Sequence, residues 1–324
     1  MQSLSSLRDK LEKSIKALNF QGKPIELYEP ILYTLNLGGK RIRPLFVLMG
    51  CDLFGGDVEA SLRPALAIEL FHNFTLLHDD IMDKAPLRRG KETVYKKWNS
   101  NVAILSGDTM FAIAYDFLTE ADPLLLPGML KLFTQTAREV CEGQQYDMNF
   151  EKQSAVTIAE YIQMIRLKTA VLLGCSLKLG AILGHASAAD ADRIYSFGEN
   201  LGLGFQLQDD LLDVFGDEEK FGKEIGGDIV SNKKTFLYLK AIELAGPTEL
   251  SALKNCFSAQ EIPSMQKINR VREIYSRLHI REKTMEQIDI FFVNALKWLQ
   301  EVDVEENRKE ELKKLAKQLL RRDF

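Results

Sequence analysis

The chain has 324 residues, and 46% of them are hydrophobic, which is enough apolar material for one large or two ordinary domains. A formal net charge of −4 disfavours nucleic-acid binding, because proteins of that class present a basic surface. The four cysteines are scattered without Cys-x-x-Cys spacing, so we expect reduced thiols and neither a metal site nor a disulfide framework. Neither a signal peptide nor a long apolar run is evident, so a water-soluble, cytoplasmic protein without stable membrane insertion is expected.

Helices are predicted nearly throughout, because only nine prolines occur and period-two alternation is scarce. Thr157 and Glu160 form a capping box that predicts a helix start. Ser100 or Asn101 is expected to cap another helix. The predicted helices, in chain order, cover about residues 3–19, 25–37, 44–54, 63–83, 102–120, 128–150, 158–183, 190–214, 235–245, 247–257, 264–278, 281–301 and 305–321.

The connecting segments predict the domain organisation. Residues 84–92 form a basic loop, and residues 215–234 form a loop rich in glycine and charge. Because no linker is long or polar enough to separate two domains, residues 1–324 are predicted to form a single all-α domain. The five central helices are apolar on wide faces and should form the inner layer of one large helical bundle.

An acidic cluster ends the predicted helix over residues 63–83. Asp79 and Asp83 are four residues apart, so their side chains share one helix face, and Asp80 lies beside them. Like charges at this spacing destabilise a helix slightly, and folding alone gives no reason for them. A hard cation removes the repulsion, and Mg²⁺ prefers carboxylate oxygens while sharing its coordination shell with substrate phosphates.

A second acidic cluster, Asp209, Asp210 and Asp213, recurs near the end of the predicted helix over residues 190–214. On a helical wheel each acidic face continues into apolar or small residues, which predicts a pocket that is charged at its mouth and apolar below. The alternative for one such cluster is a solvated face with helix-capping aspartates. Two clusters, each following an apolar run, favour metal sites that face each other and hold a diphosphate.

Basic residues follow both acidic clusters. A single lysine or arginine is usually solvent-facing, but this repeated arrangement favours binding of a diphosphate, since arginine makes bidentate and lysine point-charge contacts with phosphate. The candidates are Lys40, Arg41 and Arg43 after a Gly-Gly turn, Arg88 and Arg89 after the first cluster, and Lys223, Lys233 and Lys234 after the second.

Two residues within apolar helices have two interpretations each. Lys168 either extends its ammonium to solvent or points into a polar cavity, and the neighbouring Thr169 hydroxyl favours the cavity. His72 shares the Asp79 face and is either a hydrogen-bonded core residue or a substrate contact.

Together these residues match a known family in order and spacing. The chain resembles the trans-type isoprenyl (polyprenyl) diphosphate synthases over nearly its whole length. The matching motifs are Gly38-Gly39-Lys40-Arg41-Ile42-Arg43-Pro44, His72, Asp79-Asp80-Ile81-Met82-Asp83, Arg88-Arg89-Gly90, Gly143-Gln144, Lys168-Thr169, Gly204-Phe205-Gln206-Leu207-Gln208-Asp209-Asp210-Leu211-Leu212-Asp213, Lys223 and Lys233-Lys234-Thr235.

The resemblance implies an isoprenoid synthase fold with a central cavity, usually a homodimer, and a role for each motif residue. Three Mg²⁺ would be bound by Asp79, Asp83 and Asp209, with Asp80 and Asp213 supporting them. The allylic diphosphate would be bound by Arg88, Lys168, Lys223 and Lys233. The diphosphate of isopentenyl diphosphate would be bound by Lys40, Arg43, His72 and Arg89. The carbocation would be stabilised by the oxygen dipoles of Thr169 and Gln206, so Lys168, Thr169, Gln206 and Arg88 are the implied catalytic residues.

Product length is expected to depend on the pocket floor. In the family the floor is formed four and five residues before the first aspartate, which here are Thr75 and Phe74. The bulky Phe74 favours a short C15 or C20 product, whereas the small Thr75 leaves room beside it. The first motif lacks the two-residue insertion of bacterial farnesyl diphosphate synthases, so C20 is as plausible as C15, and a longer chain is the alternative.

Other functions fit the residues less well. A class I terpene cyclase needs no isopentenyl site, and its second metal motif usually contains Asn, Ser and Glu. A His-Asp metal phosphohydrolase would need further histidine ligands, and the remaining histidines lack a fitting context. A non-catalytic subunit should have lost an acidic motif or the basic cluster, and both are present.

Overall fold

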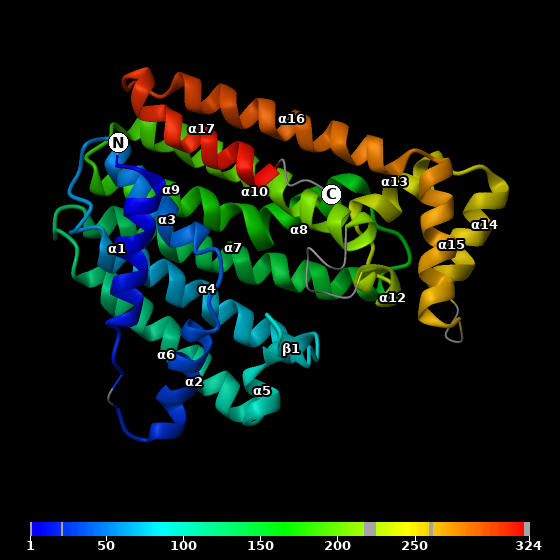
Figure 1. Cartoon of the computed structure of the whole chain (residues 1–324), viewed down its shortest axis with the longest axis horizontal. Helices are drawn as coiled ribbons and strands as arrows, with labels where there is room; N and C mark the ends of the chain where they lie inside the picture. Colours follow the sequence, from blue (N-terminus) through cyan, green and yellow to red (C-terminus); the bar gives the residue numbers. More distant parts are fainter. Residues whose placement is uncertain (1, 21, 217–224, 259–261, 321–324) are drawn as a thin grey trace. The chain divides into compact units, whose positions relative to one another are not determined.

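The structure is a computed structural model that describes residues 2–20, 22–216, 225–258 and 262–320. Its contacts divide the chain into two compact units. The first unit comprises residues 1–134, 175–195 and 302–312, and the second comprises residues 135–174, 196–301 and 313–324. The described residues are helical nearly throughout, which confirms the all-α class (Figure 1). One domain over residues 1–324 stays a prediction.

The observed elements follow the predicted helices closely. The N-terminal elements are α1 (Leu4–Lys16), α2 (Ile25–Asn36), α3 (Ile42–Leu53), α4 (Leu62–Met82), β1 (Leu87–Arg88), β2 (Lys91–Glu92), α5 (Val94–Lys97) and α6 (Ser100–Thr119). The central elements are α7 (Leu126–Lys152), α8 (Ile158–Ile165), the π-helical turn η1 (Arg166–Ala170), α9 (Val171–Leu183), α10 (Ala188–Phe215) and α12 (Gly227–Val230). The remaining helices are α13 (Phe236–Leu244), α14 (Pro247–Ser258), α15 (Ser264–Arg277), α16 (Ile280–Glu301) and α17 (Glu306–Leu320).

Helix starts follow from capping side chains. The predicted capping box is present, because the Thr157 hydroxyl accepts from the Glu160 backbone N–H and the Glu160 carboxylate accepts from that of Thr157. The prediction that Ser100 or Asn101 caps α6 is wrong by one residue. The cap is Asn99, whose side-chain oxygen accepts a hydrogen bond of 2.9 Å from the Val102 N–H.

The core of the first unit is formed by α4, which packs against α3 and α6. Helices α3 and α9 meet at two glycines. A Cβ added to Gly180 would lie 2.1 Å from the Val47 carbonyl oxygen, and one added to Gly50 would lie 2.4 Å from the Leu177 carbonyl oxygen. The backbones therefore touch, and a larger residue at either position would push the helices apart.

Short elements near the end of α4 were not predicted from the sequence. The loop 84–92 contains a two-stranded antiparallel hairpin that pairs Leu87 with Glu92 and Arg88 with Lys91 (Figure 1). The four-residue helix α5 follows it. The hairpin turns the chain back, so that Arg88 can reach the carboxylates at the end of α4.

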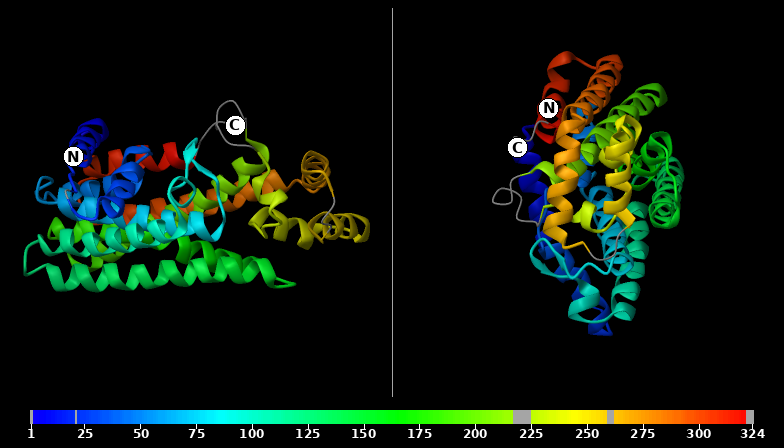
Figure 2. Two further views of the ribbon diagram at one scale, coloured as in Figure 1. Left: turned by 90° about the horizontal axis from the view of Figure 1, so that it is seen from below. Right: turned by 90° about the vertical axis from the view of Figure 1, so that its right-hand side faces the viewer.

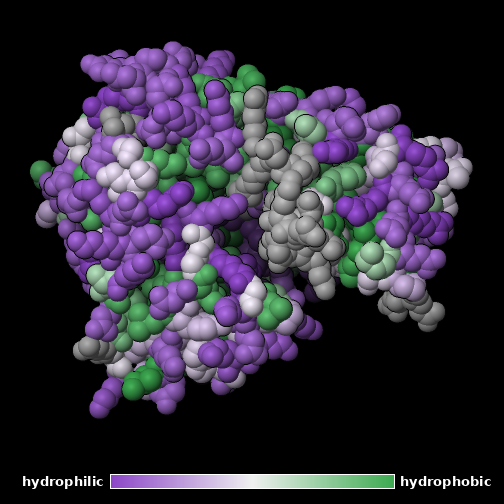
Figure 3. Space-filling model, viewed as in Figure 1, coloured by the Kyte–Doolittle hydropathy of each residue, from purple (hydrophilic) through white to green (hydrophobic). Residues whose placement is uncertain are grey.

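In the second unit, α13 packs against α8, α15 and α16, and α14 packs against α15 (Figure 2). The four cysteines are free, and all but Cys141 are buried, as expected of reduced thiols. On the face shown in Figure 3, hydrophilic residues predominate, with smaller apolar areas between them.

Within the described residues, α6 is the one helix that is long and apolar enough to cross a membrane, with a mean hydropathy of 1.3. A core helix of a globular protein also passes this test. Here α6 packs against α2, α4 and α5, and 39% of its apolar window is buried.

Candidate active site

The first acidic cluster lies at the C-terminal end of α4 and contacts Arg88. The Arg88 Nε donates a 2.7 Å hydrogen bond to Asp80 Oδ1, and its Nη2 lies 3.3 Å from Asp79 Oδ2. Asp83 is exposed and caps the helix, its N–H donating to the Asp79 carbonyl over 2.8 Å. Burial raises the pKa of Asp80, although the hydrogen bond from Arg88 opposes that rise. The cluster thus combines carboxylates with one fixed cation.

A separate basic cluster lies nearby in the same unit. Arg43 Nη1 is 3.2 Å from His72 Nε2, and Arg89 Nη1 donates to the Gly38 carbonyl. A Cβ added to Gly39 would lie 2.8 Å from the Arg89 guanidinium, so glycine permits this close approach. Burial, followed by the charges of Arg43 and Arg89, lowers the pKa of His72 well below its usual value. His72 is therefore neutral, and its Nε2 accepts from Arg43, since arginine only donates.

Arg41 differs from Arg43 in that its charge is paired with a carboxylate. It is 5% exposed and pairs with the buried Glu69, and it also donates to the Leu35 carbonyl. Its backbone is left-handed, with φ of 49°. Through these two contacts Arg41 anchors the loop that carries the exposed Lys40.

In the second unit a pocket of about 100 Å³ opens between α7, α8, η1, α10 and the segment after α12. Its polar lining consists of Asp147, Glu151, Tyr161, Lys168, Thr169, Gln206, Asp210, Asp228, Lys233, Lys234 and Thr235. Its apolar lining consists of Phe150, Met164 and Ile165. The structure therefore brings together Lys168, Thr169, Gln206 and Lys233, while Lys223 lies outside the described residues.

Lys168 and Thr169 lie on the π-helical turn η1, which interrupts the single helix predicted over residues 158–183. π-Helical turns occur often at functional sites. The Lys168 Nζ lies 2.6 Å from Asp147 Oδ2, and both residues line the pocket. Of the two interpretations of Lys168, the polar cavity is therefore correct.

Two glycines allow neighbouring helices to approach η1. A Cβ added to Gly143 on α7 would lie 2.2 Å from the Lys168 backbone nitrogen. A Cβ added to Gly202 on α10 would lie 2.6 Å from Ala170 Cα. These contacts hold the turn in place and explain why glycine precedes Gln144 in the matched motif.

A chain of hydrogen bonds crosses the pocket wall. Thr169 Oγ1 donates to Gln206 Oε1 over 3.0 Å, and Gln206 Nε2 donates to Asp210 Oδ1 over 3.1 Å. The Tyr161 hydroxyl donates to Asp210 Oδ2. Burial and the Asp210 charge raise the pKa of Tyr161, so its hydroxyl keeps its proton.

The rest of the second acidic cluster has separate contacts. The Asp228 backbone N–H donates to Asp213 Oδ2 over 3.0 Å, so Asp213 holds the start of α12. Asp209 is half-buried on α10. Lys234 Nζ donates to the Phe150 carbonyl over 2.5 Å, which fixes the segment that also carries Lys233.

Among residues 2–20, 22–216, 225–258 and 262–320, no three His, Cys, Asp or Glu side chains form a metal cage by themselves. The carboxylates of the two acidic clusters nevertheless suit Mg²⁺, because they offer hard oxygen donors and Mg²⁺ completes its shell with water and substrate phosphates. These donors fit a metal that is bound together with a diphosphate.

The two proposed floor residues lie on α4. The Phe74 ring stacks on Phe111 of α6, with centroids 5.0 Å apart and an interplanar angle of 12°. It also meets His78 edge-on. Thr75 Oγ1 donates to the His72 carbonyl over 2.8 Å.

Sequence reasoning missed four residues around these sites: Asp147, Tyr161, Asp228 and Phe111. For Asp147 a signal existed, because it lies four residues after Gly143 and so shares the helix face that approaches Lys168. Tyr161 contacts Asp210, Asp228 contacts Asp213 and Phe111 contacts Phe74. No local sequence pattern indicated these three contacts.

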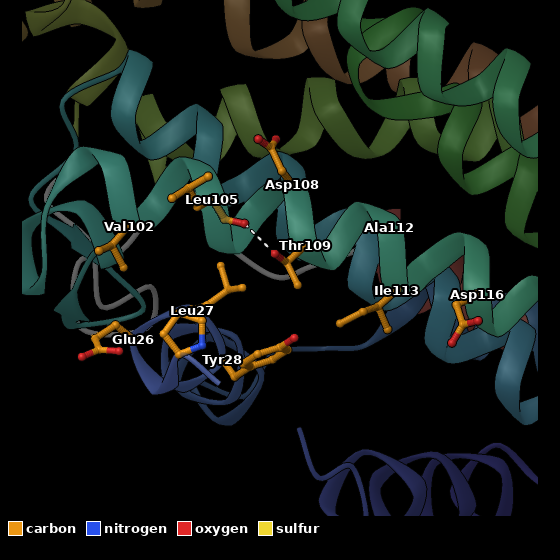
Figure 4. Close-up of a pocket in the computed structure, with 11 residues that line it drawn as sticks. Glu26, Leu27, Tyr28, Val102, Leu105, Asp108, Thr109, Ala112, Ile113 and Asp116 are labelled. Carbon is orange, nitrogen blue, oxygen red and sulfur yellow. Dashed lines mark hydrogen bonds between the residues drawn. The ribbon is translucent and has the colours of Figure 1, made fainter. Parts of the chain in front are cut away.

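A larger groove of about 680 Å³ lies on the first unit between α2 and α6. Leu27, Tyr28 and Ile113 point toward it in Figure 4, and Leu105 also lines it. Its acidic lining residues are Glu26, Asp108 and Asp116. It contains none of the residues of the acidic or basic clusters.

Comparisons with known proteins identify the family of the chain. The family profile described as polyprenyl synthetase matches residues 24–277. A geranylgeranyl diphosphate synthase of Saccharolobus solfataricus is 38% identical over 301 residues, which is 91% of this chain and 90% of that protein. A crystal structure of a geranylgeranyl pyrophosphate synthase has a TM-score of 0.96 at 43% identity and covers 100% of both chains. That of the geranylgeranyl pyrophosphate synthetase from Pyrococcus horikoshii has a TM-score of 0.91 at 33% identity, covering 99% of this chain and 98% of that one. The chain belongs to the polyprenyl synthetase family and is a prenyltransferase.

Proposed function

We propose that the protein condenses isopentenyl diphosphate head-to-tail with an allylic diphosphate and forms a short trans-prenyl diphosphate of C15 or C20. The observation that carries this proposal is the presence of two neighbouring but separate charged sites in one unit. One pairs Asp79 and Asp80 with Arg88, and the other joins Arg43, His72 and Arg89. Two diphosphates need two such sites. The geranylgeranyl diphosphate synthases among its relatives support a C20 product.

The residues divide the chemistry between them. Breaking the allylic C–O bond leaves a carbocation and a diphosphate, and we assign the stabilisation of the developing negative charge to Arg88, Lys168 and Lys233. The oxygens of Thr169 and Gln206 stabilise the cation, while apolar walls exclude water that would quench it. The isopentenyl double bond then attacks C1, and the departing diphosphate takes up the proton that is lost.

The family is magnesium-dependent, and we assign three ions to Asp79, Asp83 and Asp209, with Asp80 and Asp213 in support. When bound, Mg²⁺ neutralises the diphosphate and makes it a better leaving group. This assignment requires the two acidic clusters to face a common cavity, with the two units forming one domain.

A product analysis tests the proposal. The purified protein is incubated with Mg²⁺, isopentenyl diphosphate and, separately, the C5, C10 and C15 allylic diphosphates, and the products are sized by chromatography. We expect elongation to stop at C15 or C20. Elongation well beyond C20 would favour the longer-chain alternative, and no condensation with any primer would reject the function.

Replacing Phe74 with alanine is expected to lengthen the product by at least one isoprene unit. The ring fills the space beside α6, where it stacks on Phe111, so its removal opens the floor. Product chain length is the measurement. Phe117→Ala is the matched control, because this buried α6 residue contacts Arg63 and lies outside the cluster around Phe74. An unchanged product from Phe74→Ala would place the floor elsewhere.

Replacing Arg43 with alanine should raise the KM for isopentenyl diphosphate about 10- to 100-fold, because a charge-assisted hydrogen bond contributes about 1.5–3 kcal/mol. The KM for the allylic substrate should change much less, since Arg43 contacts His72, whereas Asp79 and Asp80 are contacted by Arg88. Arg63→Ala, which removes an exposed arginine paired with Glu120, is the control. Equal losses for both substrates would contradict separate sites.

We also propose a cytoplasmic homodimer in which the groove between α2 and α6 contacts a second copy of the chain. The groove combines apolar side chains with three acidic ones, and Leu105 on its wall is 57% exposed. An apolar surface of this kind is typical of a protein–protein contact. Sedimentation at micromolar concentration tests the proposal, and a monomer would contradict it.

A further inference from the structure

We propose that Lys267 is a positioning residue that holds the loop carrying Lys233 and thereby sets how tightly the allylic diphosphate binds. This inference rests on the proposed prenyl transfer, in which Lys233 contacts that diphosphate. Lys267 lies on α15 in the second unit and belongs to none of the matched motifs.

The backbone ends α12 in a Schellman motif. The Lys233 N–H donates to the Asp228 carbonyl over 2.9 Å, and the Asn232 N–H donates to the Ile229 carbonyl over 3.2 Å. Asn232 between them has a left-handed backbone with φ of 57°. Two such bonds around a left-handed residue define the motif, and asparagine adopts this conformation more readily than most residues. Lys233 comes next, so the direction in which it leaves α12 depends on Asn232.

The side chain of Lys267 contacts this turn twice. Its Nζ donates to Asn232 Oδ1 over 2.6 Å and to the Val230 carbonyl over 3.2 Å. The Phe257 ring of α14 lies 5.3 Å from the same nitrogen. The last carbonyls of a helix have no partner within the helix, and a lysine can supply one. Lys267 therefore caps α12 and fixes the side chain of its left-handed residue at the same time.

These two contacts do not depend on the charge of Lys267. The residue is 5% exposed, and burial lowers its pKa. A protonated lysine has three N–H donors, and a neutral lysine keeps two. Both bonds therefore persist in either protonation state.

Helix α15 also supports the beginning of α12 (Figure 1). Gly226 precedes α12 with φ of 86°, and a Cβ added to it would lie 2.7 Å from the Ile268 side chain. Ile268 follows Lys267, so adjacent residues of α15 contact the two ends of α12. On the α10 side, the Asp213 carboxylate accepts from the Asp228 N–H. The short helix is thus held between α10 and α15.

The consequence concerns the pocket in the second unit. Lys233 lines it together with Lys168 and Thr169, whereas Lys267 is not among its described lining residues. Lys267 therefore acts through the loop. Ordering a loop and a lysine side chain around a ligand costs conformational entropy. Contacts that already order the loop before the substrate arrives reduce this cost, so the diphosphate binds more tightly.

Kinetics of Lys267→Met test the proposal, because methionine keeps an unbranched apolar side chain and removes the nitrogen. We expect the KM for the allylic diphosphate to rise about 5- to 20-fold, as for the loss of one or two hydrogen bonds. The KM for isopentenyl diphosphate should stay within about twofold, since the cluster around Arg43 belongs to the first unit. A merely structural role would lower stability without separating the two KM values. Lys240→Met is the matched control, because this lysine of α13 pairs with Glu243, and both KM values should stay unchanged.

Two further measurements examine how Lys267 acts. The double variant Lys267→Met, Lys233→Ala should have the same allylic KM as Lys233→Ala alone, because Lys267 acts through Lys233. Hydrogen exchange followed by mass spectrometry reports on the loop without any reaction. The peptide containing the Asn232 and Lys233 N–H groups should exchange about 10-fold faster in Lys267→Met than in the wild type.

Three results would overturn the positioning role: an unchanged allylic KM in folded Lys267→Met, an equal rise in both KM values, or a further rise in the double variant. If Lys267→Met does not fold, Asn232→Gly replaces it. This variant removes one of the two contacts, while glycine accepts the left-handed backbone, and the absence of the KM difference would again overturn the proposal. A wild-type protein that is inactive with every primer would reject the proposed function, and unchanged exchange in Lys267→Met would reject the contact's effect on the loop.

Discussion

Replacing Asp79 or Asp209 with alanine is expected to lower turnover by about 10³-fold or more, because a metal ion at a developing anion supplies several kcal/mol of stabilisation. Asp79 lies at the end of α4 beside Arg88, and Asp209 lies on α10 one helical turn before Asp213. Each carboxylate belongs to a different unit. A loss of similar size in both variants is expected if both carboxylates bind metal on the same diphosphate.

The measurement is the initial rate of prenyl transfer across a range of Mg²⁺ concentrations, together with far-ultraviolet circular dichroism. Helicity should be unchanged, because repulsion within each acidic cluster is removed rather than created. Asp289→Ala is the matched control, since it removes an exposed aspartate of α16 and should leave the rate unchanged. Near-wild-type turnover in either cluster variant would defeat the metal assignment.

Replacing Glu69 with alanine is expected to lower the free energy of unfolding by about 3–5 kcal/mol, because it leaves the buried Arg41 charge without its carboxylate partner. The two side chains are 3% and 2% exposed. Asn73 also loses a 2.9 Å hydrogen bond to Glu69. The nearest other carboxylate, Glu12, is 3.8 Å from Arg41 Nε and can compensate only in part.

Urea unfolding measures this loss, and two variants provide controls. Glu120→Ala breaks the exposed pair with Arg63 and should cost at most about 1 kcal/mol. The double variant Arg41→Met, Glu69→Leu replaces both charges with apolar groups of similar size and should recover most of the stability. If Glu69→Ala and Glu120→Ala lower the free energy of unfolding equally, the buried ion pair of Arg41 and Glu69 does not stabilise the loop before α3.

The helices could be predicted because their determinants are local. Apolar spacing places α4 and α10, and the Thr157–Glu160 capping box starts α8, so these were anticipated to within two residues. The π-helical turn after α8 was not anticipated. It has no local pattern, because it depends on the contacts of Gly143 and Gly202 with residues far away in the chain.

In the candidate site, too, some residues could be predicted from local spacing, and others depend on contacts between distant parts of the chain. Asp79, Asp83, Asp209 and Asp213 were identified because spacing on a helix depends on residue number alone. The roles of Arg41 and Arg43 could not be separated from the sequence. Only the fold shows that one is buried against Glu69 while the other reaches His72.

By itself the sequence determined the all-α class, most of the helix boundaries, both acidic clusters and the family, because each depends on periodicity or on residue order. The tertiary structure alone decided which charges are paired, where Lys168 points and how Asp210, Gln206 and Thr169 are connected. The physical reason is that a hydrogen bond requires two atoms within about 3 Å, and chain folding brings together residues that lie far apart in sequence.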